Sequence, residues 1–169
     1  MLERFRLDGE VAVITGGGNG IGRATAAALV EAGAAVALLD RDEKAVKETE
    51  AALRAAGAEV EAYVLDITDE IALETSFEGV NRRWGRLDIL VNDAAISIRH
   101  PTAELSLADR NNVVAVNMTG VFLGSRAAAH YMLPKRKGSI VNTASIFGLS
   151  GGGLYSKRLI KRQKAALSI

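Results

Sequence analysis

The sequence contains no cysteine, only 2 prolines and 5% aromatic residues in a total of 169 residues. Without cysteine there is no disulfide framework, thiolate nucleophile or cysteine metal site. The low proline content excludes a collagen-like chain, and the 49% hydrophobic content excludes a disordered one. No apolar run reaches the roughly 18 residues of a membrane-spanning helix, and the charged start MLERFRLDGE is unlike a signal peptide. These features predict a soluble, cytoplasmic protein.

Charge is distributed unevenly along the chain. The formal net charge is +1, yet all 20 acidic residues lie at or before Asp109, and 10 of the 21 basic residues follow it. Such a basic segment can bind nucleic acid or an anionic membrane. No aromatic residues are interleaved with the basic ones, so we predict a solvated surface, with no nucleic-acid partner and no membrane partner. His100 and His130 have no acidic partner at ligand spacing, and no metal site is predicted.

Short apolar runs alternate with longer helical stretches throughout the sequence. We expect strands at 11–14, 36–39, 60–65, 87–92 and 139–144, and helices at 21–32, 42–56, 69–85 and 106–133. Asp42 is expected to cap the second of these helices and Asp69 to open the third. This alternation predicts an α/β fold, a three-layer doubly wound parallel sheet of the Rossmann type. No good candidate for the sixth strand of the order 3-2-1-4-5-6 follows Ser145, so this sheet is expected to lack its last strand. We assign residues 1–153 to a dinucleotide-binding domain and residues 154–169 to an altered basic segment.

A glycine-rich loop, TGGGNGIG over residues 15–22, joins the first strand to the first helix. Glycines let the backbone approach a pyrophosphate, whose charge a helix N-terminus favours. An acid at the end of the second strand accepts hydrogen bonds from ribose hydroxyls and repels a 2′-phosphate, and Asp40 occupies that place. The expected cofactor is therefore NAD rather than NADP. Two alternatives stay open, because Asp40 could be a plain strand-end cap and Arg41 could receive a 2′-phosphate. The cofactor residues predicted from this region are Gly16, Asn19, Gly20, Ile21, Gly22, Asp40 and Arg41.

Together with four further motifs, this loop resembles the short-chain dehydrogenase/reductase family over about residues 7–153. The motifs are Asp66-Ile67, Asn92-Asp93-Ala94-Ala95, Val116-Asn117-x-x-Gly120-x-Phe122 and Gly138-Ser139-Ile140-Val141-Asn142-x-x-Ser145. The resemblance implies that Asp66 and Ile67 meet the adenine and that Asn92 and Ala94 contact the cofactor. Asp93 stands where the family has an asparagine that braces neighbouring strands, and Ala95 stands where it has a glycine.

The resemblance also implies an activity. Family members transfer hydride between the nicotinamide of NAD(P) and a secondary alcohol or ketone. The serine that holds the substrate oxygen matches Ser145, and the asparagine that anchors a water-mediated proton path matches Asn117. The resemblance further implies a small alcohol or ketone as substrate and a homo-oligomer as the assembly.

The family's Tyr-x-x-x-Lys pattern is disrupted in this chain. Tyr155 has Leu159 four residues later, and the nearest lysine is Lys157. On a helix, residues four apart share a face, whereas Lys157 would point about 160° away from Tyr155. We interpret Tyr155 and Lys157 as the nominal catalytic pair, displaced by a loss of residues or by a frame change in the coding sequence. Two functions remain, a short-chain oxidoreductase or an NAD-binding module with little or no catalysis.

Overall fold

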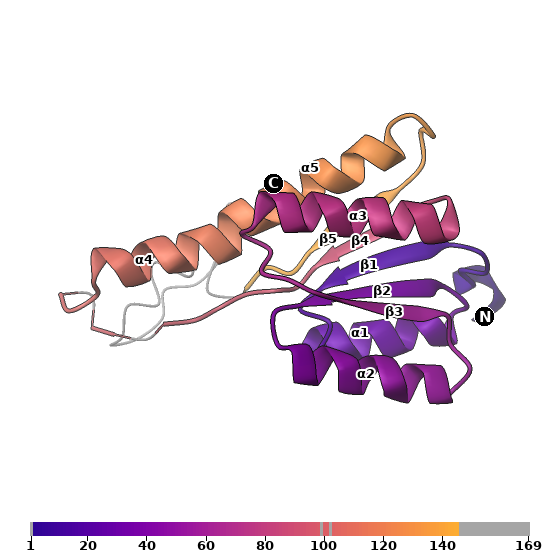
Figure 1. Cartoon of the computed structure of the whole chain (residues 1–169), viewed down its shortest axis with the longest axis horizontal. Coiled ribbons are helices and arrows are strands. Elements are labelled where there is room, and N and C mark those ends of the chain that lie inside the picture. Colours follow the sequence, from indigo (N-terminus) through magenta and orange to yellow (C-terminus); the bar gives the residue numbers. More distant parts are fainter. Residues whose placement is uncertain (1, 99, 102, 146–169) are drawn as a thin grey trace.

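A computed structural model describes residues 2–98, 100, 101 and 103–145 (Figure 1). In chain order the elements are a 3-10 helix (Leu2–Phe5), β1 (Val11–Thr15), α1 (Gly20–Glu31), β2 (Ala35–Asp40), α2 (Glu43–Ala55), β3 (Val60–Val64), α3 (Glu70–Trp84), β4 (Ile89–Asn92), α4 (Leu107–Val114), a π-helical segment (Ala115–Gly120), α5 (Val121–Met132) and β5 (Ser139–Asn142). The predicted strands are all present, with ends shifted by one or two residues. No helix in this described part of the chain is long and apolar enough to cross a bilayer.

The five strands form one parallel sheet in the order β3-β2-β1-β4-β5. In Figure 1, α1 and α2 cover one face of this sheet, and α3 and α5 cover the other. The predicted doubly wound α/β architecture is confirmed, and the strand order agrees with the first five strands of the expected pattern. The residues that the structure describes contain no sixth strand.

The central strand β1 shows why apolar residues run without interruption in this sequence. All five of its residues are buried. Val13 belongs to the buried cluster on the α3 and α5 side, which includes Phe77, whereas Ile14 belongs to the cluster on the opposite side, which includes Val46. Successive side chains of a strand point to opposite faces, so a strand covered on both faces has to be apolar at every position.

The starts of α2 and α3 are set by local chemistry that the sequence already contains. The side chain of Asp42 accepts a hydrogen bond from the Ala45 amide at 3.0 Å, and Asp69 accepts one from the Ala72 amide at 3.0 Å. Each aspartate satisfies a backbone donor that has no partner within the helix. The predicted roles of Asp42 and Asp69 at the starts of these helices are confirmed, and the parallel pairing of β2 with β3 puts the ends of both strands at the same edge of the sheet.

The predicted single helix from 106 to 133 needs a correction. Its middle turn, Ala115–Gly120, is π-helical, and it separates α4 from α5. Glycine lets this region approach the segment after β3 closely, because a Cβ atom at Gly120 would lie 2.6 Å from Cδ1 of Ile67. The 3.6-residue periodicity of the sequence does not reveal such a local widening, which is frequent at functional sites. Asn117 lies within it.

Candidate functional site

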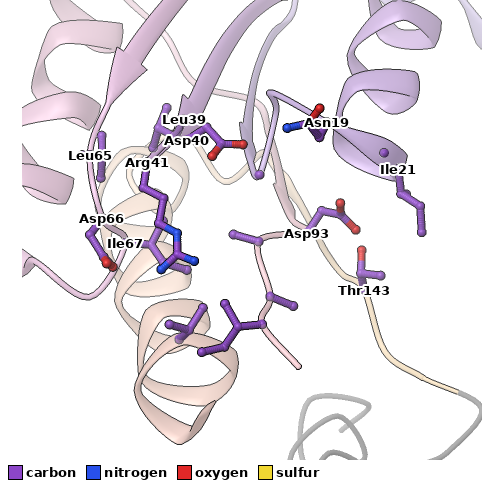
Figure 2. Close-up of a pocket in the computed structure, with 16 residues that line it drawn as sticks. Asn19, Ile21, Leu39, Asp40, Arg41, Leu65, Asp66, Ile67, Asp93 and Thr143 are labelled. Carbon is purple, nitrogen blue, oxygen red and sulfur yellow. The ribbon is translucent and has the colours of Figure 1, made fainter. Parts of the chain in front are cut away.

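A cavity of 350 Å³ lies at the carboxyl edge of the sheet, where the chain crosses from one half of the fold to the other. Of the predicted cofactor residues, its lining contains Gly16, Asn19, Gly20, Ile21, Asp40, Arg41, Asp66, Ile67 and Ala94. Figure 2 shows Asp40, Arg41 and Asp66 along one side of the cavity and Asn19 and Ile21 along the other. The structure therefore brings most of the predicted set together in one pocket of the size that small ligands occupy.

The glycine loop packs too tightly for side chains where it contacts other backbone, at Gly16 and Gly22. Gly16 has a φ of 75°, and a Cβ atom there would lie 2.9 Å from the backbone of Ala94. A Cβ atom at Gly22 would lie only 2.1 Å from the carbonyl oxygen of Gly16. Thr15 fixes the segment that Gly16 contacts, because the Oγ1 of Thr15 accepts hydrogen bonds from the amides of Asp93 at 3.1 Å and Ala94 at 3.2 Å. The loop is thereby fixed against the segment that follows β4.

Asp40 ends β2 with its carboxylate at the pocket. Its Oδ2 accepts a hydrogen bond from the Gly18 amide at 2.9 Å, and its Oδ1 accepts one from the Asp42 amide at 3.0 Å. The carboxylate therefore caps the strand end, as one of the two alternatives expected. It also lines the cavity, and each oxygen has a further lone pair that can accept from a ligand hydroxyl.

On the Asp40 side of the pocket, the wall continues with the residues that follow β3. The Oδ1 atom of Asp66 accepts hydrogen bonds from the amide of Thr68 at 2.9 Å and from its hydroxyl at 2.7 Å. Ile67 is buried, with 5% of its surface exposed, and supplies an apolar wall. Arg41 is exposed, and Figure 2 shows its guanidinium extending into the pocket on the same side as Ile67. This end combines an apolar surface with charges of both signs.

Two of the predicted cofactor residues do not line the pocket. Asn92 is only 2% exposed, and its Nδ2 donates to Asn142 Oδ1 at 2.9 Å and to Ser125 Oγ at 3.1 Å. Its side chain thus braces β4 against β5 and α5, which is the role expected for the neighbouring Asp93 position. The buried Nδ2 group thus takes its polar partners from β5 and α5, and the expected contact of Asn92 with the cofactor stays a prediction. Gly22 lies behind Gly16 and supports the loop.

Asn117 is held behind the wall of the pocket. It is 1% exposed, and its Oδ1 accepts from the Ile96 amide while its Nδ2 donates to the Ile96 carbonyl, both at 2.9 Å. Ile96 itself lines the cavity, as does Val116, the residue before Asn117. The π-helical turn therefore positions an amide that binds the backbone of the segment after β4 at two points.

The segments after β4 and β5 contribute four lining residues that were not among the predicted site residues, and Asp93 and Thr143 are the polar ones; the other two are Ala95 and Ile96. Each polar residue directly follows the last residue of its strand, and the Thr143 amide donates to the Asn92 carbonyl at 3.0 Å. Position at the carboxyl end of a parallel strand was the signal that could have found both. Ser145, half-buried, follows Thr143 by two residues. Tyr155 and Lys157 lie outside the described residues.

Sequence comparison identifies the family to which this fold and pocket belong. The family model described as short chain dehydrogenase matches residues 10–157. The chain belongs to the short chain dehydrogenase family. Levodione reductase of Leifsonia aquatica is 38% identical over 154 residues, which cover 89% of this chain and 58% of that reductase. The chain thus spans little more than half the length of this curated relative.

Solved structures of similar proteins agree with this assignment. NAD+-bound xylitol dehydrogenase superimposes with a TM-score of 0.89 at 35% identity, over 95% of this chain and 61% of that protein. Gluconate 5-dehydrogenase of Burkholderia cenocepacia J2315, in complex with NADP and tartrate, superimposes with a TM-score of 0.90 at 33% identity, over 98% of this chain and 64% of that protein. At these identities the likeness covers family as well as fold.

Proposed function

We propose that this chain binds NAD in the pocket and forms the cofactor half of an oxidoreductase that acts on a secondary alcohol or ketone. The glycine loop carries this proposal, because it meets Asp40 and Asp66 around one cavity at the carboxyl edge of the sheet. The missing room for a Cβ atom at Gly16 and Gly22 fits a loop that presents backbone amides to a diphosphate. The structures of relatives bound to NAD+ and to NADP support a nicotinamide cofactor.

In this proposal each part of the pocket takes one part of the cofactor. Residues 16–22 and the N-terminus of α1 hold the diphosphate. The carboxylate of Asp40 accepts the ribose hydroxyls and repels a 2′-phosphate, which favours NAD over NADP. Asp66 and Ile67 meet the adenine, with Arg41 beside them and Ala94 against the loop. Asn92 supports the pocket indirectly, because its side chain holds β4 to β5.

The substrate end of the proposed site lies beyond Thr143. Nicotinamide, when bound, supplies or accepts the hydride. Ser145 hydrogen-bonds the substrate oxygen, and Tyr155 moves the proton. A free phenol has a pKa of about 10, so a nearby ammonium group is needed to lower it, and Lys157 is the nominal but displaced residue for this role. Asn117 keeps Ile96 in place beside this end of the pocket. The domain limits 1–153, a homo-oligomeric assembly and a cytoplasmic location complete the proposal.

Calorimetric titration of the purified chain with NADH and with NADPH tests the cofactor assignment. We expect saturable binding with NADH favoured, and we expect Asp40→Ala to weaken NADH binding by about ten-fold or more, since hydrogen bonds to charged groups contribute about 1.5–3 kcal/mol. Asp42→Ala is the matched control, because Asp42 caps α2 without lining the pocket. Absence of heat with either cofactor would overturn the proposal.

Turnover distinguishes the oxidoreductase from an NAD-binding module without catalysis. The displaced Lys157 favours the module. A panel of ketones with NADH should show turnover that Tyr155→Phe lowers by about a hundred-fold or more, the usual contribution of a positioned acid or base. NADH affinity should stay the same in this variant. Binding without turnover in the parent chain would support the module, and equal turnover in parent and variant would show that Tyr155 is not the proton donor.

A further inference from the structure

Thr49 is a buried hydroxyl on α2 that neither the motifs nor the pocket accounts for. It is 1% exposed, on a helix whose other buried residues pack on the sheet or pair with β3. Its Oγ1 donates a hydrogen bond to the carbonyl oxygen of Gly18 at 3.0 Å. A hydroxyl without water around it needs such a partner, and here the partner is the middle of the glycine loop.

Gly18 is held from three directions at once. Its amide donates to Oδ2 of Asp40 at 2.9 Å, and its carbonyl accepts from Thr49. A Cβ atom at Gly18 would lie 3.0 Å from the amide nitrogen of Val46 and 3.1 Å from the Cβ of Ala45. Both polar backbone groups of Gly18 are therefore bound within the protein, the amide to the carboxylate at the end of β2 and the carbonyl to α2.

This attachment sets the direction of the neighbouring peptide groups. Peptide units are planar, so a residue whose amide and carbonyl are both bound has little freedom to rotate. The next residues, Asn19 and Gly20, line the pocket. A Cβ atom at Gly20 would meet no other atom within 4 Å, so the loop faces open space two residues after Gly18.

We infer that Thr49 is a positioning residue for the diphosphate part of the cofactor site, which it supports through Gly18 without touching the ligand. The inference rests on the proposed function. Asp40, which lines the ribose part of the pocket, binds the same Gly18. Gly18 therefore connects the ribose subsite to the diphosphate subsite. Loss of the Thr49 hydroxyl should therefore weaken ligands that contain a diphosphate more than ligands that lack one.

Titrations with ADP-ribose and with adenosine, the latter by competition with NADH, test this role. Thr49→Val removes the hydroxyl and keeps the branched shape, leaving the Gly18 carbonyl without its buried donor. We expect ADP-ribose affinity to fall about ten-fold and adenosine affinity to change by less than about two-fold. Thr49→Ser keeps the hydroxyl and should restore ADP-ribose binding. Thr49→Ala is the second variant if the valine variant does not fold, with the same expectation.

Ser76→Ala is the matched control, because Ser76 is a buried helix hydroxyl that donates to the Leu73 carbonyl at 2.7 Å, away from the loop. It should leave both affinities unchanged. ADP-ribose binding of wild-type strength in the Thr49 variants, or an equal loss for adenosine, would overturn the positioning role alone. A wild-type chain that binds none of NADH, ADP-ribose and adenosine would instead overturn the proposed function.

Discussion

Replacement of Gly22 by alanine is expected to abolish saturable NADH binding and to lower the free energy of unfolding by about 3 kcal/mol. The added Cβ atom would stand 2.1 Å from the Gly16 carbonyl oxygen and 3.3 Å from Oδ2 of Asp93. The carbonyl group cannot withdraw freely, because the Gly16 amide donates to the Leu39 carbonyl at 2.7 Å. Either α1 or the glycine loop must therefore move.

Helix propensity predicts the opposite sign for this variant. Alanine stabilises a helix interior by about 1 kcal/mol relative to glycine, and Gly22 lies within α1. The steric contact exceeds that gain, since a separation of 2.1 Å is far inside van der Waals contact. Urea unfolding at pH 7, followed by circular dichroism, measures the stability, and calorimetry measures the binding.

Gly57→Ala is the matched control for the loop variant. Gly57 has a φ of 87°, and a Cβ atom there would meet no atom within 4 Å. Its cost is confined to backbone strain of about 1–2 kcal/mol, and NADH binding should be that of the wild-type chain. A Gly22→Ala protein with wild-type stability and affinity would contradict the packing of the loop against α1.

Replacement of Arg86 by leucine is expected to lower the free energy of unfolding by about 3 kcal/mol at pH 7. Arg86 donates to both carboxylate oxygens of Asp88, at 2.7 and 2.8 Å, and Asp88 also accepts from the Val11 amide at 3.0 Å. Asp88 is only 4% exposed. Without the guanidinium, a buried carboxylate would remain between β1 and β4 with a single amide donor.

The pH dependence of this loss follows from the pKa of Asp88. Burial alone would raise that pKa, but the hydrogen bonds from Arg86 and the Val11 amide outweigh burial and hold it below its usual value. A carboxyl group with a lowered pKa in the folded state stabilises the protein above its unfolded pKa of about 3.9, and this stabilisation is lost as the pH falls through the folded value. The difference between wild type and Arg86→Leu should therefore shrink at acid pH.

Urea unfolding of both proteins at pH 7 and at pH 3 measures this difference. Arg110→Leu is the matched control, because Arg110 is exposed and, within the described part of the chain, its guanidinium hydrogen-bonds the side chain of the neighbouring Asn111 and no carboxylate. It should change the stability by less than about 0.5 kcal/mol at either pH. A loss in Arg86→Leu that is the same at pH 7 and pH 3 would show that the guanidinium acts by packing instead of by its charge.

Much of the pocket lining could be predicted from the sequence because its signals are local. The glycine loop and Asp66 follow their strands within a few residues, Asp40 is the last residue of its strand, and parallel strands bring their carboxyl ends to one edge. The capping roles of Asp42 and Asp69 depend on an amide three residues away, and both are confirmed. Such features need only the order of elements along the chain.

Other features depend on residues that are distant in sequence. Asn92 was expected at the cofactor, yet Asn142 and Ser125 bind its amide inside the sheet. Thr49 gave no signal, because its partner Gly18 lies 31 residues earlier and belongs to a different element. The sequence shows which side chains are polar, but it does not show which partners satisfy them once they are buried.

By itself, then, the sequence determined the α/β architecture, the family and the carboxyl edge at which the pocket lies, because hydrophobic period, glycine spacing and capping residues act over short distances. Only the tertiary structure decided that Asp93 and Thr143 line the pocket, that Asn92 does not, and that a π-helical turn carries Asn117 to the backbone of Ile96. Those outcomes depend on how buried polar groups from separate elements find partners, and this is settled only when the elements pack together.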